Sequence, residues 1–246
     1  MSAAAHFGRR IGNELYKVAF PIYRPLYTVF KSYTDRTERR LLARNLSPGS
    51  VVVDAGANIG IYSRFLSSCV GSPGMVHSFE PDPENFARLR TEVASLPNVR
   101  VNQLALSDRT GDSLLYISEE LNVDHRAYPT EGETRRTVSI RSTTLDDYFK
   151  SGERVDFIKM DLQGYELHAL RGAKRVLQEN PHMKLLLEFW PYGLKQAGVG
   201  WRDLVTTLER QGLVIWEFSK NRLRAFRVET VEERPEWYVN LFASRQ

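Results

Sequence analysis

Cysteine is almost absent from this chain: a single one, Cys69, occurs in 246 residues. One thiol cannot form an internal disulfide or build a cysteine-based zinc site, so a disulfide-stabilised or zinc-stabilised fold is not expected. No stretch approaches 18 consecutive apolar residues, which argues against a membrane-spanning helix. Residues 1–17 also lack the apolar core of a secretory signal. We therefore expect a cytoplasmic protein in a reducing compartment.

Charged residues are neither scarce nor abundant, but they are unevenly distributed. Hydrophobic residues make up 42% of the chain and charged residues 26%, which excludes wholesale disorder and fibrous repeats. Residues 1–44 hold nine basic and three acidic side chains, a net charge of +6. The remaining residues hold 25 basic and 27 acidic side chains, a net charge of −2. A nucleic-acid enzyme usually spreads positive charge around its catalytic face, so no nucleic-acid partner is expected.

Residues 10–31 combine aromatic and aliphatic side chains with scattered lysine and arginine. Pro21 and Pro25 are expected to interrupt a helix here, because each lacks a backbone N–H and clashes with the preceding turn. Two interpretations remain open. We favour two short helices that pack over the main domain; the alternative is a basic, aromatic segment that contacts a membrane surface. The alternative would make the protein membrane-associated.

A change of pattern near residue 47 predicts a domain boundary. The segment Thr34–Asn45 is rich in arginine and glutamate with helical character, and it ends before the loop signal Ser47-Pro48-Gly49. We therefore predict a basic and aromatic helical extension over residues 1–47 and a main domain over residues 48–246.

From residue 50 onward, short apolar runs alternate with helical patterns. Seven strands are predicted, at about 51–53, 75–79, 99–104, 155–160, 184–189, 213–218 and 237–242, the last as a closing edge strand. Helices are predicted at about 59–70, 83–95, 165–179 and 201–211, and an antiparallel excursion at 113–118 and 137–141. Strands that alternate with helices imply an α/β fold with a mostly parallel, doubly wound sheet of seven strands.

Polar residues end four of these strands. Asp54 follows the first, Glu80 the second, Asp161 the fourth, and Glu188 is near the end of the fifth. Ligands of open α/β sheets bind beyond the carboxyl ends of the strands. These four carboxylates are therefore the first candidates for a functional site.

The first strand runs into the sequence Asp-Ala-Gly-Ala-Asn-Ile-Gly and then into a helix. Gly56 permits a tight turn and Gly60 a close approach of helix to strand. Asn58 replaces the second glycine of a dinucleotide motif, and Asp54 would repel a pyrophosphate but suits a ligand with an ammonium group. Glu80 comes 20 residues after Gly60, where an acidic residue accepts hydrogen bonds from ribose hydroxyls. A ligand with both a cationic amino-acid end and a ribose is S-adenosylmethionine.

Three segments, Asp54–Gly60, His77–Phe86 and Val155–Ala173, resemble the FkbM-type S-adenosylmethionine-dependent methyltransferases, and the resemblance covers about residues 48–218. It implies a Rossmann-like class I methyltransferase sheet with an antiparallel last strand, and O-methylation of sugars or natural-product hydroxyls. By the same resemblance, five positions would hold the cofactor: Asp54, Gly56, Asn58, Gly60 and Glu80. Many members carry D-x-E-G-x-E after the fourth strand, where this chain has Gln163 in place of an acid. The substitution weakens any proposal of a carboxylate-rich metal site there.

The stretch from Asp124 to Tyr128 is the other concentration of reactive groups, and it resembles an Asp-His-Arg stretch of a subset of that family. His125 could take a proton from a hydroxyl group, because imidazole titrates near neutrality. Asp124 could orient it, and Arg126 could hold an anionic or hydroxyl-rich substrate. The alternative is an exposed loop with a surface ion pair.

Acceptor-binding candidates also follow the fifth strand. Glu188 and Trp190 place a carboxylate beside aromatic faces, which is typical of a pocket for a sugar or a flat organic acceptor. Asp161 and Glu188 could together offer oxygens to Mg²⁺, but two carboxylates are few for this ion, so no metal is expected. Glu166 is expected to begin its helix, where a negative charge is favourable.

We expect direct displacement, in which a substrate oxygen attacks the sulfonium methyl group of S-adenosylmethionine. The protein would position the acceptor and remove its proton, with His125 as the first candidate base and Asp161, next to the cofactor, as the alternative. The expected acceptor is a small molecule or a glycan. Two alternatives stay open: a methyltransferase that acts on RNA or protein, and a non-catalytic scaffold module of the same fold. The oligomeric state cannot be predicted.

Overall fold

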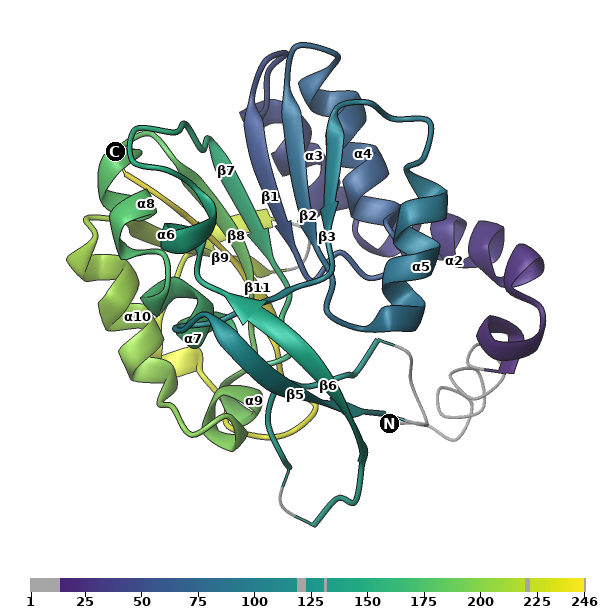
Figure 1. Cartoon of the computed structure of the whole chain (residues 1–246). Coiled ribbons are helices and arrows are strands. Elements are labelled where there is room, and N and C mark those ends of the chain that lie inside the picture. Colours follow the sequence, from purple (N-terminus) through teal and green to yellow (C-terminus); the bar gives the residue numbers. More distant parts are fainter. Residues whose placement is uncertain (1–13, 119–122, 131, 220–221, 246) are drawn as a thin grey trace.

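Short apolar runs of the chain form one large sheet between two layers of helices (Figure 1). The structure is a computed structural model and describes residues 14–118, 123–130, 132–219 and 222–245. In these residues the main sheet has eight strands in the order β10-β9-β11-β8-β7-β1-β2-β3. Their bounds are β1 Val51–Ala55, β2 Met75–Phe79, β3 Val99–Asn102, β7 Phe157–Met160, β8 Lys184–Phe189, β9 Val214–Ser219, β10 Arg222–Ala225 and β11 Val239–Ser244.

The order of the strands reverses beside β1. This strand pairs in parallel with β2 on one side and with β7 on the other. The chain builds outward from β1 through β2 to β3, and later from β7 to β8 in the opposite direction. Ligands of doubly wound sheets bind beyond the carboxyl ends of the strands at such a reversal. The predicted mostly parallel, doubly wound sheet is confirmed.

Two details of the predicted sheet are wrong. In the described part the main sheet has eight strands rather than seven, because the chain returns after β9 as the short edge strand β10. The segment predicted as a closing edge strand is β11, which lies between β8 and β9 and is antiparallel to both. Three successive residues of β11, Leu241, Phe242 and Ala243, are apolar and buried. Because successive residues of a strand face opposite sides of the sheet, this run suits a strand that is covered on both faces. The antiparallel strand implied by the family resemblance is thereby present.

Alternating residues of β1 send their side chains to opposite faces of the sheet. Val53 packs with the helices of one layer, and Val52 packs with Leu66 and other residues of the second layer. The first layer holds α6 Leu145–Tyr148, α7 Glu166–Arg171, α8 Lys174–Glu179, α9 Pro191–Gln196 and α10 Trp201–Arg210. The second holds α3 Arg36–Asn45, α4 Ile61–Val70 and α5 Pro83–Glu92. A short 3-10 helix, Val228–Thr230, follows β10.

The helix predicted over residues 165–179 is two helices, α7 and α8. Gly172 lies between them, and a Cβ atom there would stand 2.1 Å from the carbonyl oxygen of Ser107. This close approach needs a glycine, which also favours the end of a helix. The prediction that Glu166 begins its helix is confirmed.

The predicted antiparallel excursion is a small second sheet. It has the order β4-β6-β5, with β4 Ala105–Leu106, β5 Gly111–Ile117 and β6 Arg136–Thr143. The β5–β6 ribbon lies below the main sheet in the view of Figure 1. The loop that joins β5 to β6 carries residues 123–130, which include the Asp-His-Arg stretch.

Near the N-terminus, residues 14–18 are helical and α2 runs from Phe20 to Thr34 without a break. The prediction that the two prolines interrupt this helix is wrong. Pro21 occupies the first turn, where no intrahelical donor is needed, and both prolines are exposed, so water can reach the carbonyl group that Pro25 leaves without a donor. No helix in the described ranges is both long enough and apolar enough to cross a membrane.

The second of the N-terminal helices, α3, packs on the main sheet, whereas the choice between packing and membrane contact for residues 10–31 stays open. Leu42 of α3 and the adjacent Leu46 belong to the same core cluster as Val52. Residues 1–13 of the predicted extension lie outside the described residues, and the domain boundary between residues 47 and 48 stays a prediction.

Candidate active site

The turn after β1 is shaped by glycine. Gly56 has a φ of +74°, and a Cβ atom on it would stand 2.0 Å from the carbonyl oxygen of Asp161. Gly60 has a φ of +89° at the start of α4, with Leu89 of α5 packed against it. Asn58 adopts a φ of +49°, which is uncommon for a residue with a side chain. The turn thereby brings the backbone that follows β1 against the backbone that follows β7.

Glu80 connects the end of β2 to this turn. One carboxylate oxygen accepts the backbone N–H of Asn58 at 2.8 Å, and the other accepts the N–H of Asp82 at 3.0 Å. The side chain is buried, and burial raises the pKa of Glu80 to about 8. Each oxygen can accept at least one further hydrogen bond. Glu80 is therefore held in place by two backbone N–H groups, and both of its oxygens can still accept hydrogen bonds from a ligand.

Asp54 lies beneath the turn. It is fully buried, one of its oxygens accepts a hydrogen bond from the Ser63 hydroxyl at 2.7 Å, and the other lies 3.4 Å from the Lys159 ammonium. Lys159 also donates to the carbonyl of Gly56 at 3.3 Å. The Asp54–Lys159 pair thus ties β1 and β7 to the turn, and direct contact between Asp54 and a cofactor stays a prediction. Within the described chain the second Asp54 oxygen accepts no hydrogen bond.

Gln163 joins two of the predicted carboxylates. Its amide nitrogen donates to Asp161 at 2.8 Å and to Glu188 at 3.2 Å, and its φ is +54°. The structure therefore brings Asp161 and Glu188 together beyond β7 and β8. Burial, reinforced by the charges of Asp161 and Glu166, raises the pKa of Glu188 well above its ordinary value. Across the described ranges, no three His, Cys, Asp or Glu side chains are grouped to hold a metal ion.

Glu166 fixes the loop that carries Asp161 and Gln163. One of its oxygens accepts the backbone N–H groups of Leu162 at 2.7 Å and Gly164 at 3.4 Å. The carboxyl is fully buried, and burial raises the pKa of Glu166 to about 7. Its other oxygen accepts no hydrogen bond from the described residues.

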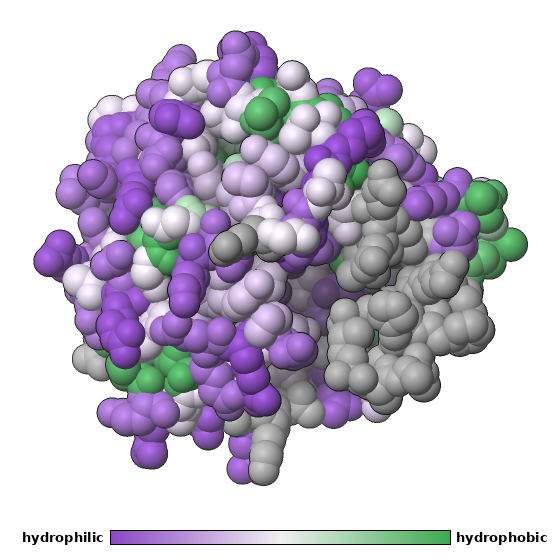
Figure 2. Space-filling model, turned by 90° about the horizontal axis from the view of Figure 1, so that it is seen from below, coloured by the Kyte–Doolittle hydropathy of each residue, from purple (hydrophilic) through white to green (hydrophobic). Residues whose placement is uncertain are grey.

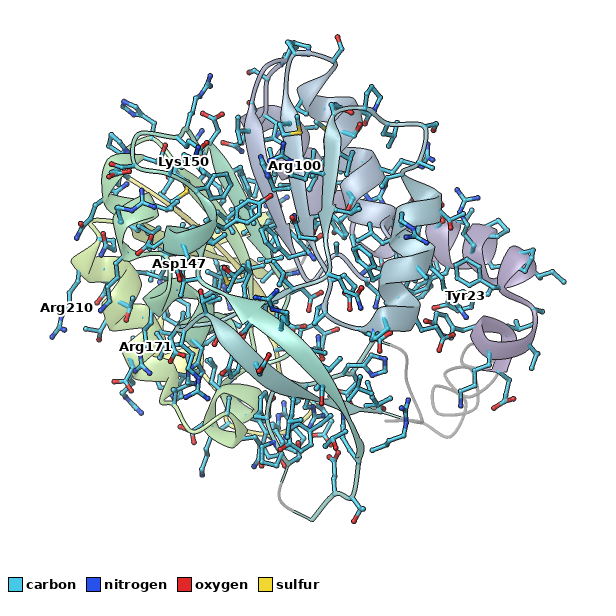
Figure 3. The ribbon with its side chains drawn as sticks, in the orientation of Figure 1. Tyr23, Arg100, Asp147, Lys150, Arg171 and Arg210 are labelled. Atoms are coloured by element: carbon cyan, nitrogen blue, oxygen red, sulfur yellow. The ribbon has the colours of Figure 1, made fainter. Side chains whose placement is uncertain are left out.

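The inner face of α2 covers this region. Tyr23, labelled in Figure 3, is buried and packs with Ile59 of the turn. Burial and the nearby charge of Asp161 both raise the pKa of Tyr27. Lys31 forms an ion pair with Asp35 at 2.6 Å. Burial lowers the pKa of Lys31, but the charges of Asp35 and Asp161 outweigh this effect and raise it. An N-terminal helix thus adds a phenol and an ammonium group to the carboxylates at the strand ends.

The Asp-His-Arg stretch is part of a buried ion-pair network. The Arg126 side chain is 7% exposed, pairs through two nitrogens with Asp124 at 2.9 and 3.1 Å, and donates to Thr130. Its guanidinium lies 5.1 Å from the ring centre of Trp190. The alternative of an exposed surface ion pair is therefore wrong. Trp190, itself mostly buried, donates to the carbonyl of Pro235 at 2.9 Å.

His125 is half-buried, and burial lowers its pKa. Its Nδ1 accepts the backbone N–H of Ser118 at 3.1 Å. The charges of Asp82 and Asp124 act against this lowering of the pKa. His125 therefore lies near Asp82, the residue that caps the start of α5. Because Nδ1 accepts a hydrogen bond, the neutral ring carries its proton on Nε2.

Several residues of this region were given no role by sequence reasoning. The sequence does mark Lys159 as unusual, because it is the one charged residue in the otherwise apolar strand β7. Tyr128 donates a hydrogen bond to the backbone carbonyl of Gln163 at 2.5 Å and so connects the Asp-His-Arg stretch to the Asp161–Glu188 pair. Tyr27 and Lys31 come from a distant part of the sequence, and nothing in their local pattern marks them. A hollow of about 420 Å³ adjoins the stretch and is lined by Pro129, Thr130, Lys195 and Gln196.

Comparisons with known proteins agree with this geometry. The sequence model of the methyltransferase FkbM domain matches residues 54–224. The 2-O-methyltransferase NoeI of Sinorhizobium fredii is 28% identical over 160 residues, which cover 58% of this chain and 65% of the relative. The hexuronic acid methyltransferase AglP of Haloferax volcanii is 30% identical over 143 residues, 56% of each chain. The matched region therefore spans less than two thirds of either relative.

Solved structures show the same fold. The methyltransferase FkbM from Methylobacillus flagellatus aligns with a TM-score of 0.51 and 18% identity, over 90% of this chain and 54% of its own. A Streptococcus mutans protein described as a methyltransferase, in complex with SAH, aligns with a TM-score of 0.51 and 12% identity, over 85% and 96%. At these identities the likeness concerns the fold, which is that of the class I methyltransferases.

Proposed function

Because this chain belongs to the FkbM methyltransferase family, we propose that it transfers a methyl group from S-adenosylmethionine to a hydroxyl group of a sugar, a glycan or a secondary metabolite. The observation that carries the proposal is the gathering of the glycine turn, Glu80, Asp161 and Glu188 at the strand ends beside the reversal of the sheet. The printed names of two relatives, a 2-O-methyltransferase and a hexuronic acid methyltransferase, support a sugar hydroxyl as the acceptor.

The residues at the turn fit the cofactor. Glu80 keeps free acceptor capacity on both oxygens, as contact with ribose hydroxyls requires. Gly56 and Gly60 keep the turn free of side chains, and Asn58 is oriented by the bond from its N–H to Glu80. Asp161 follows β7 directly beside Gly56. We assign cofactor binding to these residues, with Asp54 and Lys159 supporting the turn from beneath.

When bound, S-adenosylmethionine supplies a methyl group that its sulfonium already activates. The chain has two tasks: to orient the acceptor hydroxyl and to take up its proton. The hydrogen bond from the Ser118 N–H to Nδ1 supports a role for His125 other than that of base, because a neutral ring then carries its proton on Nε2. We therefore assign His125 to hydrogen-bond donation toward the acceptor, and we assign proton uptake to the Asp161–Glu188 pair.

Two observations support the carboxylate pair as the base. Both side chains are half-buried at the strand ends and accept hydrogen bonds from Gln163. The raised pKa of Glu188 makes this carboxylate a stronger proton acceptor than an exposed one. Arg126, held by Asp124 and Thr130 beneath Trp190, positions the loop that carries His125.

The test is transfer of a labelled methyl group to a panel of sugars, uronic acids and hydroxylated natural products, with the affinity for S-adenosylhomocysteine measured in parallel. Glu188→Gln should lower turnover about a hundredfold and keep cofactor affinity within about threefold, as expected for lost general-base catalysis. Asp161→Asn should lower turnover at least as much and also weaken S-adenosylhomocysteine binding, because Asp161 is assigned to the cofactor as well. Asp112→Asn, at an exposed residue of β5, is the matched control and should match the wild type.

Methylation of amines or thiols, with every hydroxyl acceptor inert, would contradict the O-methylation proposal. A His125→Ala variant that loses all turnover while Asp161→Asn and Glu188→Gln retain it would instead return the role of base to His125.

A further inference from the structure

The outer face of α2 is apolar and exposed. Six large hydrophobic side chains between residues 18 and 33 are 58% to 79% exposed: Val18, Ile22, Leu26, Val29, Phe30 and Tyr33. Pro21 and Pro25 are exposed on the same helix. Figure 2 shows apolar surface at the right-hand edge of the molecule, on the side where α2 lies in Figure 1.

These side chains form a continuous surface. Five of them belong to α2, where Ile22, Leu26, Val29 and Tyr33 fall within about 60° of the helix circumference and Phe30 borders this arc. Val18 lies in the helical residues just before α2. They make up half of the large exposed hydrophobic residues in the described part of the chain, and the other six are scattered from Leu114 to Tyr238. Single exposed apolar residues are ordinary, whereas a contiguous set marks an interaction surface.

The inner face of α2 is already occupied by the protein core. Tyr23 is buried together with Tyr16 and Ile59, and the partly buried Tyr27 packs against them. The outer face is therefore a second apolar surface, which packing of the helix on its own domain does not use.

Arg36, the first residue of α3, borders this face: its guanidinium lies 5.3 Å from the ring centre of Tyr33. Arg40 and Arg44 are exposed further along α3. The acidic residues of this region point elsewhere: Asp35 pairs with Lys31 and accepts from Tyr62, and Glu38 accepts a hydrogen bond from Asn240.

A basic hollow adjoins the inner side of the helix. It has a volume of about 260 Å³ and is lined by Phe20, Arg24, Arg64, Arg88, Thr91 and Glu92. Arg24 and Arg64 both pair with Glu92, and Arg88 pairs with Glu84, so the three arginines exceed their acidic partners by one charge.

We propose that the outer face of α2 binds the surface of an anionic lipid bilayer, with the helix lying in the plane of the interface. A helix of 15 residues is too short to span a bilayer but suits this orientation, and arginine beside an apolar arc is the pattern of interfacial helices. A second copy of the chain fits less well, because a twofold contact sets this face against itself, and the acidic residues beside it already have partners. The inference does not depend on the proposed function.

The test is flotation of the full chain with vesicles of phosphatidylcholine alone and of phosphatidylcholine with phosphatidylglycerol. The wild type should float with the anionic vesicles, less so as salt increases. Leu26→Gln/Val29→Gln should lower the bound fraction about tenfold, and Arg36→Gln/Arg40→Gln should lower it only on anionic vesicles. The matched control is Leu114→Gln/Val228→Gln, which changes two exposed apolar residues elsewhere and should bind as the wild type does.

Unfolding curves and S-adenosylhomocysteine affinities of all variants show whether the fold is kept. The proposal is overturned if the wild type binds neither kind of vesicle, or if the Leu26→Gln/Val29→Gln variant floats as well as the wild type. It is also overturned if the wild type dimerises without binding vesicles and this variant is monomeric, since a second copy then covers the face.

Discussion

The carboxyl group of Glu166 allows a sharp test of the loop that carries Asp161 and Gln163. It is fully buried, one oxygen accepts two backbone N–H groups, and burial raises its pKa from 4.5 to about 7. The unfolded chain therefore loses this proton at lower pH than the folded protein does. Since the folded state then binds more protons, the free energy of unfolding falls as pH rises from about 5 to about 8.

The magnitude follows from the shift. A pKa of about 7 in place of 4.5 costs the folded wild type about 3 kcal/mol at pH 8 and about 1 kcal/mol near pH 5, where the unfolded carboxyl has begun to ionise and the folded one has not. Glu166→Gln cannot ionise, and its amide oxygen can still accept from Leu162 and Gly164. The variant should match the wild type within about 1 kcal/mol near pH 5 and exceed its stability by about 1–3 kcal/mol near pH 8.

The assay is urea unfolding of both proteins at the two pH values. Glu166→Ala is the control, because it removes the acceptor of both N–H groups and should be less stable than Glu166→Gln at each pH by about 1–3 kcal/mol. The reasoning is refuted if the difference in unfolding free energy between Glu166→Gln and the wild type is the same near pH 8 as near pH 5.

Three further predictions concern the site. Gly56→Ala should lower the free energy of unfolding by about 2–4 kcal/mol and weaken S-adenosylhomocysteine binding, measured by denaturation and calorimetry, because its Cβ would collide with the Asp161 carbonyl. Gln163→Glu should lower turnover about tenfold or more at neutral pH and less at acidic pH, because a third carboxylate would join Asp161 and Glu188. Arg126→Lys should cost about 1–3 kcal/mol of stability and raise the acceptor KM with cofactor affinity unchanged, because its two-nitrogen contact is lost. Unchanged kinetics in either of the last two would contradict the corresponding assignment.

The part of the site best predicted from sequence is local in the chain. The turn from Asp54 to Gly60 joins a buried strand to a helix, and Glu80 follows at the end of the next strand, so residue type and spacing predicted that these residues lie together. Their contact with a cofactor stays a prediction. The carboxyl ends of parallel strands share one edge of the sheet, which also placed Asp161 and Glu188.

The rest depends on contacts between distant segments. The two prolines of α2 do not break the helix because they are exposed, so that water can reach the carbonyl group left without a donor. Their exposure could not be predicted from the sequence. The partners of Arg126 include Trp190, 64 residues away, so the local pattern suggested a surface ion pair where the fold buries one. The proton position on His125 depends on Ser118, across a loop.

The central claim, a cofactor site for S-adenosylmethionine at the strand ends, is tested most directly by calorimetric titration with S-adenosylhomocysteine. The wild type should bind it, and Glu80→Ala should bind it about tenfold or more weakly, since the acceptor for the ribose hydroxyls is gone. Glu84→Ala changes an exposed carboxylate of the adjacent helix α5 and should bind as the wild type does. A wild type that does not bind S-adenosylhomocysteine, or a correctly folded Glu80→Ala variant that binds it equally well, would contradict the account.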